Sequence, residues 1–216
     1  MPYLFETEEH QALRQQIRRF AERAIAPHAL CWEERGEFPR ELYKEAAAIG
    51  GLGVGFPEAY GGAGGDVTHM LVLTEELTLS GRSVGTAVGL GSLAIAVPPI
   101  LLLGTEEQKR RLLPPIFAGE HIAALAITEP SGGSDVANLK TQARRTDDHY
   151  IINGSKTFIT SGCRADLVVT AVRTDPDATK RHLGLSLLCV ERGTPGFDQS
   201  RKLDKMGWWA SDTAEL

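Results

Sequence analysis

Apolar residues recur at helical spacing through the first 120 positions of the chain. Thr7 offers a capping hydroxyl, and the pattern after it predicts an amphipathic helix that ends near Pro27. The apolar face of this helix holds Leu13, Ile17, Phe20, Ala21 and Ala24. Further helices are predicted over residues 40–49 and around Met70 to Leu77. The glycine-rich segments between them fit no phosphate-binding fingerprint, so they indicate turns and helix C-caps.

The stretch from Ser83 to Thr105 has 23 residues and no charge. That length would span a bilayer, but its glycines and the pair Pro98-Pro99 interrupt it, which favours a helix buried inside a soluble bundle. One face carries only small residues: Gly85, Gly89, Ser92 and Ala96. Such a face indicates either close approach of another helix or the lining of a tunnel for a long apolar ligand. Thr105 and Gln108 predict a capping box for the next helix, which Pro114-Pro115 is expected to stop.

After residue 120 the pattern changes to short apolar runs typical of strands. The runs are 122–127, 150–153, 156–160, 167–172 and 183–190, and the final T-A-E-L resembles a strand that is cut off. Asn153-Gly154 predicts a hairpin between the second and third runs. The fold class expected is therefore α+β, with an all-α bundle over residues 1–119 followed by an antiparallel β-barrel or sandwich over 120–216.

Composition and charge narrow the functional classes. The net charge is −5 and the basic residues are scattered, so neither a nucleic acid nor an anionic membrane is indicated as a partner. The three cysteines are far apart, which argues against a disulfide framework and a zinc site and favours a reducing compartment. The acidic start resembles neither a signal peptide nor a transit peptide. We therefore expect a cytoplasmic protein.

Two motifs carry the candidate chemistry. The first, A-I-T-E-P-S-G-G-S-D from Ala126, follows an apolar strand and gathers backbone N–H groups and a hydroxyl at Gly132-Gly133-Ser134. Such a cluster suits a pyrophosphate, although capping a helix is an equally good explanation for Ser134. The second, I-N-G-S-K-T-F-I-T-S-G from Ile152, places Phe158 and Thr160 on one face of a predicted strand. That face suits stacking against a flat ring and hydrogen bonding to its edge.

Together the two motifs resemble the flavin-binding signature of the acyl-CoA dehydrogenase family, and the similarity extends from the first helix to K-L-D-K-M-G-W-W-A-S-D-T-A-E-L. The resemblance implies that FAD is held by Leu125, Ile127, Thr128, Gly133, Ser134, Phe158, Ile159 and Thr160. It also implies that Ser134 touches an acyl-CoA. Phe158 stands where many members have Trp, and it keeps an aromatic face. Asn138 and Trp209-Ala210 depart from the family pattern, in which a small residue and Arg-Gly are common at these places.

The reaction that the resemblance implies is α,β-desaturation of an acyl-CoA thioester with hydride transfer to FAD. An electron-transferring flavoprotein is the implied acceptor and a homotetramer the implied assembly. Family members carry the catalytic glutamate in a C-terminal helical domain, whereas this chain ends at Leu216. We therefore expect no catalytic base within residues 1–216, and an inactive chain by itself. Glu129, beside the flavin loop, is expected to be structural.

Gly89 is expected to contact the substrate, because medium-chain members place a larger residue there, near the bottom of the acyl pocket. A smaller residue would deepen the pocket, so the expected substrate is a medium-long or long straight-chain acyl-CoA. Lys180, Arg181 and His182 are expected to form a solvated loop end, and contact with CoA phosphates is the alternative. Two alternatives remain: a short protein that binds an acyl-CoA or a partner without catalysis, and a flavin oxidase or monooxygenase of the same fold.

Overall fold

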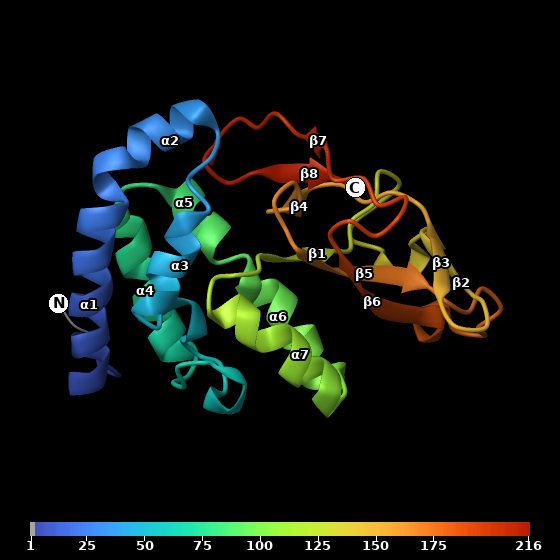
Figure 1. Ribbon diagram of the computed structural model, residues 1–216, viewed down its shortest axis with the longest axis horizontal. Coiled ribbons are helices and arrows are strands. Elements are labelled where there is room, and N and C mark those ends of the chain that lie inside the picture. Colours follow the sequence, from blue (N-terminus) through green and yellow to red (C-terminus); the bar gives the residue numbers. More distant parts are fainter. Residues whose placement is uncertain (1–2) are drawn as a thin grey trace. The chain divides into compact units, whose positions relative to one another are not determined.

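The computed structural model describes residues 3–216, and its internal contacts divide the chain into two units. A helical unit contains the residues up to His121 together with Lys205–Ser211, and a β unit contains Ile122–Asp204 and Asp212–Leu216 (Figure 1). A helical part followed by a strand part confirms the expected fold class. The domain limits at 119 and 120 stay a prediction, and the contacts add Lys205–Ser211 to the helical unit.

The helices of the first unit form largely where the apolar pattern predicts them. They are α1 (Glu8–Ala24), α2 (Ala29–Arg35), α3 (Glu41–Ala48), α4 (Val67–Gly81), α5 (Val84–Leu90), α6 (Leu93–Leu103) and α7 (Glu106–Phe117). Thr7 and Thr105 are N-caps, as the sequence predicts. The predicted capping box forms between Thr105 and Gln108, and Thr7 forms one with His10. The core of this unit is apolar and includes the fully buried Ile17, Phe38, Tyr43, Leu90 and Leu113.

Three expectations about the uncharged stretch and the helix after it are wrong. It forms two helices rather than one, and the break falls at Gly91-Ser92, where glycine is a poor helix former. Pro98-Pro99 lie inside α6, and Pro114-Pro115 lie inside α7, which continues to Phe117. Burial of neighbours such as Val97 and Leu113 offsets the cost of the missing amide bonds. By length and composition the 20 residues Val84–Leu103 suffice to cross a membrane, but half of them are buried in the protein.

A buried carboxylate ties α1 to α4. The side chain of Glu76 on α4 is 2% exposed, and its Oε1 lies 2.8 Å from both Arg14 Nη1 and Arg18 Nη2 on α1. Ser80 Oγ donates a third bond to Oε2 at 2.8 Å. Burial raises the pKa of the Glu76 carboxyl, but these donors outweigh burial and lower it to about 2. Glu76 is therefore an ionised, fully paired charge in the interior of the helical unit.

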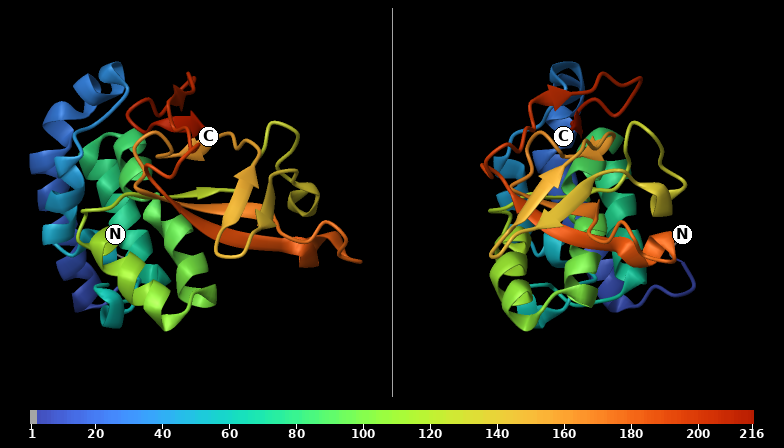
Figure 2. Two further views of the ribbon diagram at one scale, coloured as in Figure 1. Left: turned by 45° about the vertical axis from the view of Figure 1, so that its right-hand side comes forward. Right: turned by 90° about the vertical axis from the view of Figure 1, so that its right-hand side faces the viewer.

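The β unit contains two sheets (Figure 2). Its strands are β1 (Ala123–Ala126), β2 (Gln142–Arg145), β3 (Tyr150–Asn153), β4 (Ile159–Thr160), β5 (Leu167–Arg173), β6 (Leu185–Glu191), β7 (Arg201–Lys202) and β8 (Thr213–Glu215). The larger sheet has the order β1-β5-β2-β3 with β6 on β5, and the smaller has the order β4-β8-β7. The larger sheet is mixed rather than purely antiparallel, because β1 pairs with β5 in parallel. The sheets do not close into a barrel in residues 3–216.

The predicted hairpin across Asn153-Gly154 is wrong. β3 pairs with β2 through the turn at residues 146–149, and β4 pairs with β8 about 50 residues later. Gly154 instead lets the chain pass close to Thr141, whose Cα would lie 2.7 Å from a Cβ at this position. The second motif therefore leaves one sheet and enters the other, which brings it beside the first motif.

Candidate functional site

The first motif forms a tight turn after β1 whose glycines are exposed to solvent. Glu129 and Gly132 exchange two backbone hydrogen bonds of 3.0 Å, which close the turn. No heavy atom lies within 4 Å of the position that a Cβ on Gly132 would take, and Gly133 and Ser134 are exposed. The backbone N–H of Gly132 donates within the turn, so it is not among the groups available to a pyrophosphate. The exposed Gly133 and Ser134 are the residues of the turn that remain compatible with the pyrophosphate hypothesis.

The second motif presents an aromatic ring from a left-handed backbone. Phe158 has a φ of 61° and its side chain is 69% exposed, although it lies between the buried Thr157 and Ile159. This corrects the assumption that Phe158 and Thr160 share a face by strand alternation, because β4 begins only at Ile159. A left-handed conformation is unfavourable for a large side chain. The surrounding structure holds the ring outward against this cost, a pattern typical of functional sites.

A backbone bond joins the two motifs directly. The N–H of Thr157 donates to the carbonyl of Thr128 at 2.9 Å, and Lys156 exchanges two backbone bonds of 2.9 Å with Leu216. The residues predicted to hold FAD are thereby gathered in one unit. They are Leu125, Ile127 and Thr128 at the end of β1, Gly133 and Ser134 in the turn, and Phe158, Ile159 and Thr160 at β4. The side chain of Ile159 is 2% exposed and packs in the core, so only its backbone is available to a ligand.

A buried ion pair fixes the turn beneath these residues. Lys156 Nζ lies 2.9 Å from Glu129 Oε1, and the two side chains are 3% and 4% exposed. The Lys156 ammonium also donates to the carbonyl of Ile127 at 3.0 Å, and the backbone N–H groups of Lys140 and Thr141 donate to the Glu129 carboxylate. Burial raises the pKa of Glu129, but these hydrogen bonds outweigh burial and lower it to about 2. Glu129 is a structural anion, as expected.

Sequence reasoning missed Lys156. The residue lies inside the second motif, but nothing in its neighbourhood indicates burial, because lysine is almost never fully buried unless it is paired. Its partner Glu129 is 27 positions away, so no local spacing reveals the pair. The combination of a lysine and a glutamate in two motifs already assigned to one site is the signal that would have found it.

Gly89 lies in the helical unit and faces a side chain. A Cβ added there would lie 2.5 Å from Cε1 and 2.8 Å from Cζ of Phe38. Of the two explanations for the small-residue face, close packing therefore applies at this position. An apolar cavity of about 70 Å³ in the helical unit is lined in part by Ala87 and Leu90 of α5 and by Gly91, and neither Gly89 nor Phe38 lines it.

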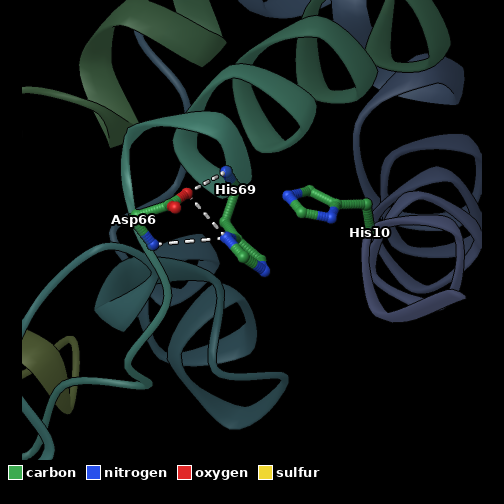
Figure 3. Close-up of side chains that lie close together, drawn as sticks. All are labelled: His10, Asp66 and His69. Atoms are coloured by element: carbon green, nitrogen blue, oxygen red, sulfur yellow. Dashed lines mark hydrogen bonds and ion pairs between the residues drawn. The ribbon is translucent and has the colours of Figure 1, made fainter. Parts of the chain in front are cut away.

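A second cluster of potential ligands consists of His10, Asp66 and His69 (Figure 3). His10 and His69 each accept a hydrogen bond on Nδ1 from the N-cap backbone of their helix, Thr7 at 3.3 Å and Asp66 at 3.2 Å. Their rings are stacked with centroids 3.9 Å apart, which keeps the nitrogen lone pairs in nearly parallel planes rather than converging on one point. The arrangement suits two neighbouring helix caps better than a metal centre.

Comparison with known proteins supports the family resemblance that the two motifs indicate. Residues 7–120 match the family model for the acyl-CoA dehydrogenase N-terminal domain, and residues 124–216 match that for the middle domain. The chain is 41% identical to the mouse mitochondrial long-chain specific acyl-CoA dehydrogenase, covering 96% of this chain and 48% of the relative. It is 39% identical to the mitochondrial isovaleryl-CoA dehydrogenase of Pongo abelii, covering 97% and 50%.

Solved structures give the same result. The acyl-CoA dehydrogenase of Geobacillus kaustophilus superposes with a TM-score of 0.90 at 45% identity, over 99% of this chain and 56% of that one. A glutaryl-CoA dehydrogenase of Mycobacterium smegmatis in complex with FADH2 gives 0.87 at 30% identity, over 97% and 52%. The chain spans about half the length of the relatives it matches. It belongs to the acyl-CoA dehydrogenase family, of which it contains the N-terminal and middle domains.

Proposed function

We propose that the protein containing this chain is an FAD-dependent acyl-CoA dehydrogenase that desaturates the α,β bond of an acyl-CoA thioester. The observation that carries the proposal is the Thr157–Thr128 backbone bond, which joins the segment of the exposed glycine turn to the segment of the exposed Phe158 ring. Family membership supports the reaction class, and the solved relative with FADH2 supports the cofactor. Bound FAD would supply the hydride acceptor.

The exposed groups of the β unit fit such a cofactor. The amides and hydroxyl at Gly133 and Ser134 would bind the pyrophosphate, and Phe158 would pack against the flat ring system. Leu125, Ile127, Thr128, Ile159 and Thr160 would contribute backbone and side-chain contacts along the ends of β1 and β4. Ser134 would also contact the acyl-CoA. These assignments follow from the resemblance to the family, and the exposure of Gly133, Ser134 and Phe158 supports them.

The catalytic base is proposed to lie outside residues 1–216. Glu129, the carboxylate inside the flavin motif, is 5% exposed, bound to three donors and ionised, so it is unavailable to remove a substrate proton. A homotetramer, a cytoplasmic location and an electron-transferring flavoprotein as acceptor complete the proposal.

For the substrate we propose a medium-long or long straight-chain acyl-CoA, supported by the likeness to the mouse long-chain enzyme. Gly89 adds no support through a deeper pocket, because Phe38 fills the space beside it. The isovaleryl relative is almost as similar, so branched short thioesters are the competing class. A competition assay with the full-length protein is expected to rank long straight chains first; a preference for short branched thioesters would contradict this.

The test of the reaction is an anaerobic visible spectrum of the full-length protein with FAD, before and after addition of a long-chain acyl-CoA. We expect a bound flavin spectrum that bleaches with substrate, and no bleaching from residues 1–216 alone. Bound flavin that substrate does not reduce would favour a non-catalytic binder. Rapid reoxidation by oxygen rather than by an electron-transferring flavoprotein would favour an oxidase.

Substitutions at Phe158 test whether its left-handed backbone is strained and whether its ring binds FAD. Phe158→Gly is expected to raise the free energy of unfolding of the flavin-free protein by up to about 1 kcal/mol, because glycine accepts the left-handed backbone. Loss of the ring is expected to weaken FAD binding roughly tenfold. Phe158→Ala is the control, since it removes the ring and keeps the strain. Urea unfolding and flavin titration measure both quantities, and a glycine variant no more stable than the alanine variant would refute the strain.

A further inference from the structure

A cavity of about 230 Å³ in the β unit is lined by basic side chains. Its charged residues are Lys140, Arg173 and Arg181, and no carboxylate of residues 3–216 lines it. Lys140 and Arg181 are exposed, so a ligand can reach the cavity from solvent. The volume is far larger than a single water molecule needs. A concave site that gathers three positive charges suits an anion with more than one negative charge.

Strand pairing brings these residues together from separate segments of the chain. Gln142 at the start of β2 lies beside Arg173 at the end of β5. Arg181 belongs to the connection from β5 to β6, which contains the short 3₁₀ helix η5 (Arg181–Gly184). This helix lies beside η4 (Val136–Asn138), the 3₁₀ helix that precedes Lys140. No spacing along the sequence reveals the cluster, because its members meet only in the folded sheet.

The hydrogen bonds of the three cations go to neutral oxygens. Asn138 Oδ1 accepts from Lys140 Nζ at 3.0 Å and from Arg181 Nη1 at 3.3 Å. Arg173 is half-buried and donates to the carbonyls of Arg181 at 3.1 Å and of Ala137 at 2.6 Å. Within residues 3–216, no ion pair joins any of the three to a carboxylate. Like charges held this close repel each other, and a bound anion would relieve the repulsion.

A phosphate group matches the cavity better than a carboxylate does. A phosphate monoester carries about two negative charges at neutral pH and three acceptor oxygens, whereas a carboxylate carries one charge. The guanidinium groups of Arg173 and Arg181 offer planar pairs of donors that suit two phosphate oxygens at once, and Lys140 adds a point charge. Asn138 holds two of these cations by one oxygen atom, which a small residue at this position would not provide.

We propose that the cavity at Lys140, Arg173 and Arg181 binds a phosphate group, with Asn138 as the residue that positions two of the cations. Two sources supply this chemistry: the phosphates of an acyl-CoA, and a free nucleotide that binds independently of the substrate. Ser134, the proposed contact for acyl-CoA, lies shortly before Asn138 in the chain. The inference concerns binding alone, so it does not depend on the proposed reaction.

The test measures dissociation constants of the full-length protein for CoA, ATP and inorganic pyrophosphate by isothermal titration calorimetry. Arg181→Gln and Lys140→Gln are each expected to weaken binding of the phosphate ligand roughly tenfold, because each removes a charged hydrogen-bond donor. Asn138→Ala is expected to weaken it about threefold, since both cations remain but lose their shared acceptor. Arg144→Gln is the matched control: Arg144 is an exposed cation on β2 that does not line the cavity.

The outcomes separate the two sources of phosphate. Weaker binding of CoA in the Arg181 and Lys140 variants, with ATP displacing CoA from wild type, assigns the cavity to the substrate. Weaker binding of ATP and pyrophosphate with unchanged binding of CoA assigns it to a free nucleotide. Affinities that equal those of Arg144→Gln for all three ligands refute the proposal, as does a wild type that binds none of them. A wild type that oxidises no acyl-CoA refutes only the proposed reaction, because calorimetry needs no turnover.

Discussion

Replacing Glu129 by glutamine is expected to lower the free energy of unfolding by about 3–5 kcal/mol and to abolish FAD binding. The substitution leaves the ammonium of Lys156, which is 3% exposed, without its counter-charge. It also replaces one carboxylate oxygen by an N–H₂ group, which then faces the backbone N–H of either Lys140 or Thr141, and each of these donors needs an acceptor. The turn that carries Gly133 would then lose its anchor.

Urea unfolding followed by circular dichroism measures the stability change, and flavin fluorescence quenching measures FAD binding in the full-length protein. Asp148→Asn is the matched control, because Asp148 is an exposed carboxylate of the same unit. Its effect should stay within about 0.5 kcal/mol. A Glu129→Gln variant that loses less than about 1 kcal/mol and still binds FAD would show that the ion pair does not hold the site.

The second large expected effect is the loss, at acidic pH, of the stability that the ionised Glu76 carboxylate contributes. The folded-state pKa of Glu76, about 2, lies below its ordinary value of 4.5. The stabilisation is therefore complete above about pH 4.5 and is lost as the pH falls toward about 2. A depression of this size corresponds to about 3 kcal/mol. Glu76→Gln is expected to be less stable than wild type by at least that amount at neutral pH. The difference in free energy of unfolding between the two proteins is expected to become smaller as the pH falls.

Unfolding experiments at neutral pH and near pH 3 on wild type and Glu76→Gln measure this difference. Glu129 also titrates in this range, so only the difference between the two proteins isolates Glu76. Glu45→Gln, at an exposed position on α3, is the control and should follow the wild-type pH dependence. A gap between wild type and Glu76→Gln that stays constant with pH would contradict the role of the ionised carboxylate.

The sequence by itself determined the features that depend on neighbours along the chain. The caps at Thr7 and Thr105, the apolar face of α1 and the β-rich runs at β5 and β6 all follow from local spacing and propensity. The two motifs were also recognisable as a candidate flavin site, because ordinary core packing does not require glycine, hydroxyl and aromatic residues at these spacings. The structural role of Glu129 follows from its place before Pro130 in a turn.

Only the tertiary structure decided which distant segments meet. β3 pairs with β2 and β4 with β8, although Asn153-Gly154 is a strong local hairpin signal, because strand pairing depends on partners far along the chain. Pro98 and Pro114 are tolerated inside helices because burial of their neighbours outweighs local propensity. Phe158 keeps its left-handed backbone, and Phe38 fills the space at Gly89, through packing that no sequence period records. Long-range burial thus set the geometry of a candidate site whose FAD-contacting residues the resemblance of the two motifs had indicated, and it added the buried Lys156 that the sequence did not reveal.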